Sequence, residues 1–161
     1  EIYTLSLHDA LPILALFMKR VTDTTEIRDL VYEKVFEGDI TEMLEDAAGK
    51  INIYQVNGPI FFGVVQDFIH KTKELNQSME VLILDMRHTH AIDASAVDAI
   101  NKLLAQCSKL NIKLYLTHVN EQPARVLKRM GFTDRLGEEN IYETKTKAIV
   151  DAYEYVQKLI A

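Results

Sequence analysis

The sequence predicts an α/β fold in which a partly parallel central sheet is flanked by helices, and three patterns carry this prediction. The segment KINIYQV, residues 50–56, alternates apolar and polar residues, as a half-buried strand does. The segment VLILDM, residues 81–86, is a continuous apolar run, which is typical of a strand buried on both faces. Apolar residues recur at helical spacing after both segments. Strands that alternate with helices in this way indicate a partly parallel sheet.

The stretch before these strands is polar and acidic, and we interpret residues 21–49 as a linker with marginal structure of its own. It contains a short strand candidate, VYEKVF at residues 31–36. It also contains a weak helix candidate, ITEMLEDAA at residues 40–48.

The first predicted strand stops at the turn sequence Asn57-Gly58-Pro59. Pro59 is well placed to open a helix over residues 59–75, because proline fits the first position of a helix. The apolar residues of this segment share one helical face.

Three helices and one strand are predicted after the buried strand. A helix follows the motif AIDASAVDAI and runs to about Leu110, and the strand IKLYLTHV spans residues 112–119. A short helix over residues 122–130 is closed by Gly131, which suits the position just past a helix end. Residues 140–160 contain a last amphipathic helix.

Composition indicates an ordinary globular protein of one domain. The chain has 161 residues, with 24 acidic and 18 basic side chains and a formal net charge of −6. A negative balance argues against nucleic-acid binding, which needs a concentrated positive field. The single cysteine, Cys107, has no partner for an internal disulfide, so a reducing compartment is expected.

The first twenty residues differ from the rest. Residues 1–13 look like a translated sequencing adapter, and we exclude them from the fold as non-native. An apolar run closed by Lys19 and Arg20 follows. Positive charges after an apolar run are typical of the cytoplasmic end of a membrane helix. From the residues alone, a short buried segment of a soluble protein is the simpler interpretation.

The motif AIDASAVDAI, residues 91–100, lies at a strand-to-helix turn, and such turns form the edge of the sheet where ligands usually bind. Asp93 is well placed to cap the following helix by accepting hydrogen bonds from its free N–H groups. Ser95 then falls in the first turn, where the helix dipole would stabilise a phosphate, and where an unmodified serine is equally at home.

Other polar residues give weaker signals. His88 and His90 share one side of an extended segment, but a third metal ligand with suitable spacing is missing and His118 is distant in sequence, so no metal site is predicted. Cys107 lies on an apolar helical stripe and is expected to be a buried, inert thiol. A small basic cluster is a candidate surface for an acidic partner, and it consists of Arg125, Lys128 and Arg129. The sequence contains no Walker loop, dinucleotide fingerprint, catalytic triad or zinc spacing, and we therefore expect no enzyme activity.

The order of three segments resembles the STAS domain at the C-terminus of SulP-family (sulfate permease-like) anion transporters. These segments are INIYQVNGPIFFG, VLILDMRHTHAIDASAVDAI and LYLTHVNEQPARVLKRMGF. The resemblance covers about residues 50–160, and the GPIFF and QPARVLKRMGF motifs are specific to the transporter branch. LALFMKR, residues 14–20, is similar to the end of the last membrane helix in that family.

The resemblance implies a STAS, or anti-sigma-factor-antagonist-like, fold with a central mixed sheet of about four strands flanked by helices. In this layout residues 14–20 end the last transmembrane helix, residues 21–49 are a linker and residues 50–161 are the STAS domain.

The resemblance also implies a site at the 93–97 turn. In the anti-sigma-factor antagonists this turn reads Asp-Ser-Ser-Gly, and a partner kinase phosphorylates its second serine. Ser95 occupies that place and is a candidate phosphosite, whereas Ala94 replaces the first serine and Ala96 replaces the glycine. Asp93, Val97 and the three residues between them therefore form a candidate nucleotide- or partner-binding turn.

The function implied is that of a cytoplasmic regulatory domain of a SulP-type secondary transporter of the sulfate, bicarbonate or dicarboxylate class. Its partners would be the membrane domain of the same transporter and a nucleotide or acidic protein, with no cofactor and no nucleic acid, and a homodimer would form through the full-length transporter. The alternative is a free-standing switch of the anti-sigma-factor-antagonist type, phosphorylated at Ser95.

Overall fold

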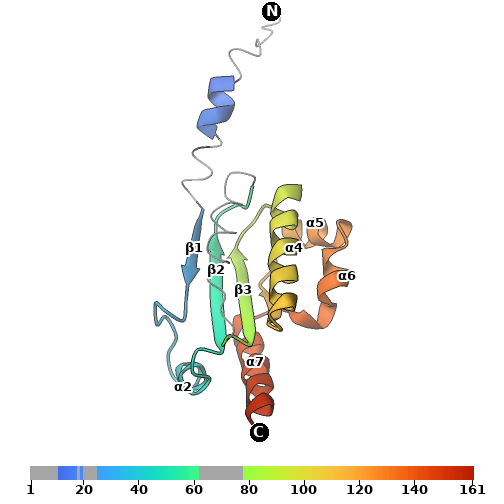
Figure 1. Ribbon diagram of the computed structural model, residues 1–161. Helices are drawn as coiled ribbons and strands as arrows, with labels where there is room; N and C mark the ends of the chain where they lie inside the picture. Colours follow the sequence, from blue (N-terminus) through green and yellow to red (C-terminus); the bar gives the residue numbers. More distant parts are fainter. Residues whose placement is uncertain (1–10, 18, 20–24, 62–77) are drawn as a thin grey trace, which may run out of the picture.

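The computed structural model describes residues 11–17, 19, 25–61 and 78–161. Within them, five strands form one sheet in the order β1-β2-β3-β4-β5. Figure 1 shows β1, β2 and β3 side by side. Their bounds are Glu26–Asp29 for β1, Ile51–Asn57 for β2, Val81–His88 for β3, Lys113–Thr117 for β4 and Ile141–Tyr142 for β5. Strands β2 to β5 pair in parallel and β1 pairs antiparallel to β2, so the mixed sheet predicted from the sequence is confirmed.

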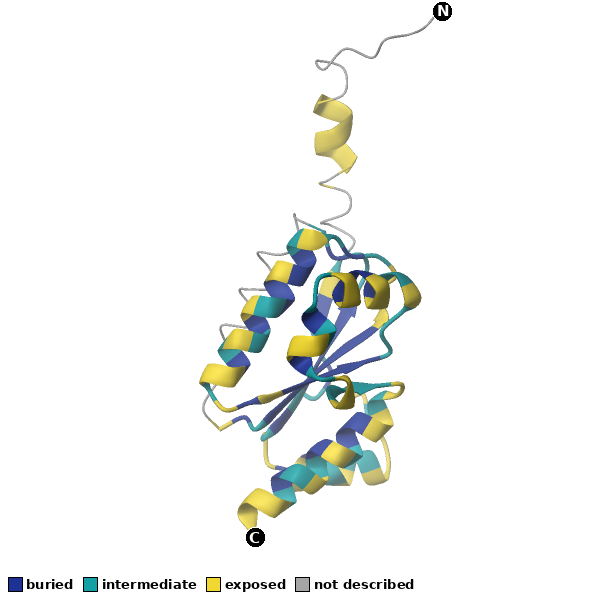
Figure 2. Cartoon of the chain, turned by 90° about the vertical axis from the view of Figure 1, so that its right-hand side faces the viewer, coloured by how far each residue is buried: buried dark blue, intermediate teal, exposed yellow. Residues whose placement is uncertain are grey.

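Helices cover both faces of this sheet (Figure 2). On one face lie α4 (Ala94–Lys109), α5 (Glu121–Arg129) and α6 (Phe132–Leu136), and on the other lie α2 (Asp39–Asp46) and α7 (Lys145–Ile160). Alternate residues of β3 separate the two cores, because successive side chains of a strand point to opposite faces. Leu82 and Leu84 join the α4 core, whereas Val81 and Ile83 join the α7 core.

Local signals explain where the helices begin and end. Asp93 caps α4 and Thr144 caps α7, each through a side-chain oxygen that accepts a backbone N–H. Gly131 follows α5 with a φ of 69°, the left-handed conformation that glycine adopts without strain, as predicted. The helices predicted over 40–48, 122–130 and the end of the chain are confirmed within a few residues.

The stretch before β2 differs from its prediction. The strand expected at residues 31–36 is wrong, because residues 30–34 form a turn and the strand lies earlier, at β1. β1 pairs along the edge of the sheet, and Leu30 and Leu44 are buried in the α7 core. Residues 25–49 are therefore packed as part of the folded unit rather than as a linker.

Three short elements between α5 and α7 had no counterpart in the sequence prediction. α6 directly follows Gly131, a 3₁₀ turn spans Glu138–Asn140, and β5 adds two residues to the sheet beside β4. None of them is long enough to produce a periodic pattern. The helix expected over residues 59–75 does not begin at Pro59, because residues 59–61 are not helical and Ile60 forms an isolated bridge with Ile92. The rest of this prediction lies outside the described residues.

Residues 11–17 are helical, and their side chains are exposed. Among all the residues that the structure describes, no helix is both long and apolar enough to cross a membrane. The predictions that residues 1–13 are non-native and that residues 14–20 end a membrane helix stay predictions.

If residues 25–49 belong to the folded unit, truncating a buried side chain there should destabilise the whole domain. We expect Leu44→Ala to lower the free energy of unfolding by about 2 kcal/mol, through lost apolar burial and the cavity that remains. Tyr32→Ala is the matched control, because Tyr32 is 86% exposed, and it should change stability by less than about 0.5 kcal/mol. Urea denaturation followed by circular dichroism measures both, and equal stability of the two variants would contradict this packing.

Candidate functional site

The 93–97 turn is built around the carboxylate of Asp93. Its Oδ1 accepts a hydrogen bond from the Ala96 N–H over 2.9 Å and from the Ser95 hydroxyl over 2.6 Å. The Asp93 carbonyl accepts from the Val97 N–H over 3.3 Å, which closes the first turn of α4. The sequence predicted this cap, and the structure adds that Ser95 is tied to the same oxygen atom.

Exposure divides the five residues of the turn into two groups. Ala94 is exposed and Ser95 is half-buried, so both can meet a ligand. Ala96 and Val97 are fully buried in the α4 core, so a ligand can reach only their backbone. Access to the turn is therefore through Asp93, Ala94 and Ser95.

The last two residues of β3 and the loop after it, residues 87–93, lead into the turn and are called the 87–93 loop here. The segment after β2 holds one side of this loop. The Gly58 N–H donates to the carbonyl of His88 over 3.1 Å. The Ile60 N–H donates to the carbonyl of Ala91 over 3.0 Å. Residues of the GPIFF motif thus act as backbone supports for the loop.

The other side of the 87–93 loop is held by the start of α5. Asn120 Nδ2 donates to three carbonyls, those of Met86, Arg87 and Thr89. Gln122 pairs with both backbone groups of Ile92, accepting from its N–H and donating to its carbonyl, each over 3.0 Å. The start of the QPARVLKRMGF motif therefore fixes the position of the turn relative to α5.

A buried acid, Asp85, lies in β3 two residues before Arg87, and the sequence analysis did not single it out. Asp85 is fully buried in the middle of the sheet. Its Oδ2 accepts from Lys145 Nζ over 3.0 Å, and its Oδ1 lies 3.2 Å from His118 Nδ1 and 3.3 Å from Thr117 Oγ1. The Arg87 N–H also donates to Oδ1, over 3.2 Å. The only sequence signal for this cluster was a single charge within an apolar run.

Two opposing effects set the charge state of Asp85. Burial is the largest and would raise its pKa, because a charge is poorly solvated inside a protein. Three groups lower the pKa of Asp85: the ammonium of Lys145, the backbone N–H of Arg87 and His118. Together they outweigh the effect of burial, so the net pKa of Asp85 is lowered. Asp85 is therefore a carboxylate in the folded protein at neutral pH.

The remaining candidates from the sequence behave as follows. Cys107 is buried, and desolvation raises the pKa of its thiol to about 12, which makes it unreactive at neutral pH. His88 and His90 are exposed. In the part of the chain that the structure describes, no three histidine, cysteine, aspartate or glutamate residues gather as a metal site would need.

Comparison with known proteins decides the family, because the STAS domain family matches residues 45–148. The chain belongs to the STAS domain family. A crystal structure of a sulfate transporter family protein from Wolinella succinogenes is 31% identical, with a TM-score of 0.62, over 68% of this chain and 88% of that one. The structure of SLC26A9 shares the fold over 91% of this chain and 26% of that one, with 17% identity and a TM-score of 0.68.

Among curated proteins, the "Putative sulfate transporter YvdB" of Bacillus subtilis (strain 168) is 23% identical over 128 residues. The bicarbonate transporter BicA of Synechocystis sp. is 20% identical over 126 residues. These matches cover 79% and 78% of this chain but only 23% and 22% of the relatives. The chain thus spans less than a quarter of the length of the curated relatives that it matches.

The basic cluster of the STAS domain lies on α5, whose start adjoins the turn (Figure 1). Arg125, Lys128 and Arg129 are all exposed, and Arg125 pairs with Glu121 over 2.7 Å. Lys128 also borders a pocket of about 320 Å³ between α5, α6 and β5. Its other lining residues are Val119, Ala124, Leu127, Thr133, Glu138 and Ile141.

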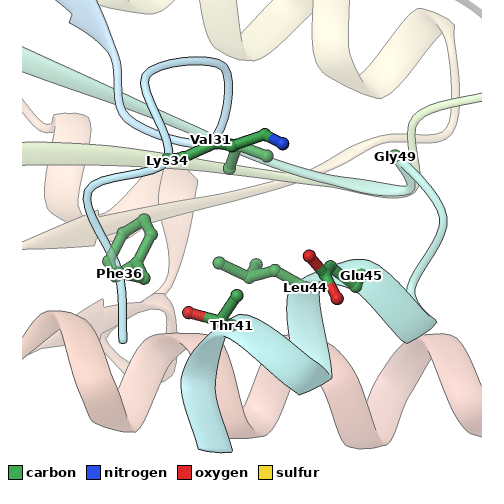
Figure 3. A pocket seen from close by; sticks show the side chains of 7 residues that line it. All are labelled: Val31, Lys34, Phe36, Thr41, Leu44, Glu45 and Gly49. Carbon is green, nitrogen blue, oxygen red and sulfur yellow. The ribbon is translucent and has the colours of Figure 1, made fainter. Parts of the chain in front are cut away.

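A second pocket of the STAS domain, of about 290 Å³, lies between the turn after β1 and α2 (Figure 3). Its lining residues are Val31, Lys34, Phe36, Thr41, Leu44, Glu45 and Gly49. Because Leu44 belongs to the α7 core and the 93–97 turn belongs to the α4 face, this pocket is separate from the candidate site.

The Asp93 cap gives a stability prediction. Asp93→Ala should lower the free energy of unfolding by about 1 kcal/mol, because the Ala96 N–H loses its acceptor. Asp93→Asn should retain most of the stability, since asparagine caps almost as well. The control is Asp98→Ala on the exposed face of α4, expected within about 0.5 kcal/mol of the wild type. Chemical denaturation of the four proteins measures this, and an Asp93→Ala variant as stable as the control would contradict the cap.

The lowered pKa of Asp85 predicts acid sensitivity. A carboxyl whose pKa is lower in the folded state adds stability above its unfolded pKa and loses it as pH falls through the folded pKa. Thermal melts should therefore show the wild type losing stability below about pH 4 more steeply than Asp85→Asn, which cannot titrate there. Asp98→Asn should follow the wild-type curve. Parallel curves for the wild type and Asp85→Asn would contradict the assignment.

Proposed function

We propose that this STAS domain is the cytoplasmic regulatory part of a SulP-type anion transporter, and that it acts by binding a partner or a nucleotide at the 93–97 turn. The observation that carries the proposal is the match to transporter proteins, of which this chain corresponds to less than a quarter. In this proposal the transported anion belongs to the sulfate, bicarbonate or dicarboxylate class and is selected elsewhere in the transporter.

The turn suits a binding role because its accessible part is small and rigidly held. Ala94 and Ser95 are presented at the start of a 16-residue helix, where the helix dipole favours an anion. Hydrogen bonds from the segments after β2 and β4 fix the loop that carries them. A ligand there regulates transport only if it binds two states of the transporter unequally.

The membrane domain of the same transporter is the first partner in this proposal. Residues 14–20 would form the end of its last membrane helix, and the chain would continue from that helix into β1. The domain would then lie on the cytoplasmic face of the membrane, and a homodimer would form through the full-length transporter.

The proposal assigns no catalytic chemistry to the domain. The hydroxyl of Ser95 donates to Asp93 Oδ1, and that oxygen also accepts the Ala96 N–H. A carboxylate that already accepts two hydrogen bonds is a weak general base, so it leaves Ser95 a poor nucleophile.

The alternative is a free-standing switch phosphorylated at Ser95, and the half-buried hydroxyl in the first turn of α4 favours it. The cost is electrostatic, because a phosphate would replace a hydrogen-bond donor and place like charges beside Asp93. Mass spectrometry after incubation with ATP and host lysate tests this alternative. Phosphate on Ser95 would support it, and an unmodified Ser95 would count against it.

Ligand binding at the turn can be tested on the chain itself. We expect ATP or GTP to cause NMR chemical-shift changes centred on residues 93–97, and Ala94→Glu to weaken this binding at least tenfold by charge repulsion. Ala105→Glu is the matched control, because Ala105 is an exposed alanine farther along the same helix. Shift changes elsewhere, or equal loss in both variants, would contradict a nucleotide site at the turn.

Attachment to a transporter is tested separately. We expect the genomic sequence upstream of the Leu14 codon to encode several hundred codons of apolar spans in the same frame. In the full-length protein, Ala94→Glu should change the rate of anion uptake into membrane vesicles, whereas Ala105→Glu should not. A stop codon shortly upstream of Met18 would overturn the transporter assignment and favour the free-standing switch.

A further inference from the structure

The cluster around Asp85 contains a second contact whose geometry depends on a proton. His118 follows β4 directly, and Arg87 lies near the end of β3. Arg87 Nη2 lies 2.7 Å from His118 Nε2, and His118 Nδ1 lies 3.2 Å from Asp85 Oδ1. The imidazole ring therefore bridges an exposed cation and a fully buried carboxylate.

Only one protonation state of His118 fits these two contacts. A guanidinium donates hydrogen bonds and cannot accept them, so Nε2 must carry a lone pair that accepts from Arg87. A carboxylate only accepts, so Nδ1 must carry the hydrogen that faces Asp85. The observed arrangement therefore requires a neutral imidazole in the Nδ1–H tautomer.

We propose that His118 and Arg87 form a proton-operated latch. A proton that binds from solvent to Nε2 of His118 occupies the lone pair on which the Arg87 contact depends. It also places an imidazolium beside a guanidinium, two like charges at hydrogen-bond distance. The Arg87 side chain then leaves the ring and enters solvent, while the hydrogen bond from Nδ1 to Asp85 remains.

Among the residues that the structure describes, the charged groups around His118 and its partner Asp85 lie on β3 and α7. Asp85 on β3 favours the imidazolium, whereas Arg87 on β3 opposes it. Lys145 on α7 also opposes it, but it is held by the other oxygen of Asp85. Of the two cations, Arg87 is the exposed one in direct contact with the ring, so it is the one that protonation moves.

The latch lies beside the 87–93 loop, which leads into the candidate site. Arg87 begins the loop that ends at Asp93, and its carbonyl accepts a hydrogen bond from Asn120 at the start of α5. Acidification would therefore add a free guanidinium and an imidazolium next to this loop without unpairing Asp85. This inference does not rest on the proposed function, because it needs only the observed contacts.

Long-range ¹H–¹⁵N NMR of the imidazole rings tests the latch on the 161-residue chain. We expect His118, assigned through a His118→Gln variant, to show the Nδ1–H tautomer at pH 8 and to gain a proton at Nε2 on acidification. His88 and His90 serve as internal references, because both are exposed. An Nε2–H tautomer for His118 at pH 8 would overturn the proposal, and this measurement needs no variant of Arg87.

A second measurement isolates the role of Arg87. In Arg87→Met the midpoint of the His118 titration should move to higher pH by about half a unit or more, because a hydrogen bond to the neutral ring and a competing cation are both lost. The matched control is Arg28→Met, whose guanidinium pairs with Glu33 beyond the far edge of the sheet. An unchanged midpoint in a folded Arg87→Met protein, or an equal shift in the control, would overturn the latch.

Discussion

The buried carboxylate of Asp85 is the constraint on which the edge of the sheet next to the 93–97 turn depends. It lies in the central strand and accepts hydrogen bonds from β4, from its own strand and from the start of α7. A fully buried charge is tolerated only when its oxygens are satisfied, so these donors must be placed together. The carboxylate thus fixes how the ends of β3, β4 and α7 meet.

A second set of hydrogen bonds holds the loop that leads from β3 to the 93–97 turn. The 87–93 loop begins with the last two residues of β3, and the residues after them form no helix or strand beyond a single bridge at Ile92. Backbone groups of residues 58–60 support one side, and Asn120 and Gln122 support the other. The two motifs that most resembled transporter STAS domains therefore support the same loop from opposite sides.

Periodicity predicted the parts of the fold that are long and buried. VLILDM reads as a strand because both faces of β3 are covered, and the apolar stripe of α4 follows from one buried helical face. Asp93 was predictable because a cap depends only on its own helix. The strand β1 was missed because a four-residue edge strand carries almost no sequence pattern. The strand was predicted too late in the chain because Tyr32 and Val35 are apolar, although both are exposed in the structure.

Asp85 shows why the rest could not be predicted. Its side-chain partners lie 32, 33 and 60 residues away in sequence, at Thr117, His118 and Lys145. Each of these residues is ordinary where it stands: one ends a strand, one follows it, and one begins a helix. Only the parallel register of β3 and β4, with Asp85 opposite Thr117, brings the first two to the carboxylate.

The hydrogen-bond cluster around Asp85 contributes more to the arrangement of its partner residues than to the free energy of unfolding. A buried ion pair often contributes no more than apolar residues of similar volume, because desolvation offsets the attraction between the charges. What it does provide is a defined arrangement, since each donor has one acceptor and a displaced partner leaves a charge unpaired. In this domain His118 Nδ1 contacts Asp85, and the other ring nitrogen, Nε2, contacts the exposed Arg87. The buried contacts of Asp85 join β3 to β4 and α7. The contact between Arg87 and His118 is the part of the cluster that a proton from solvent would break in the proposed latch.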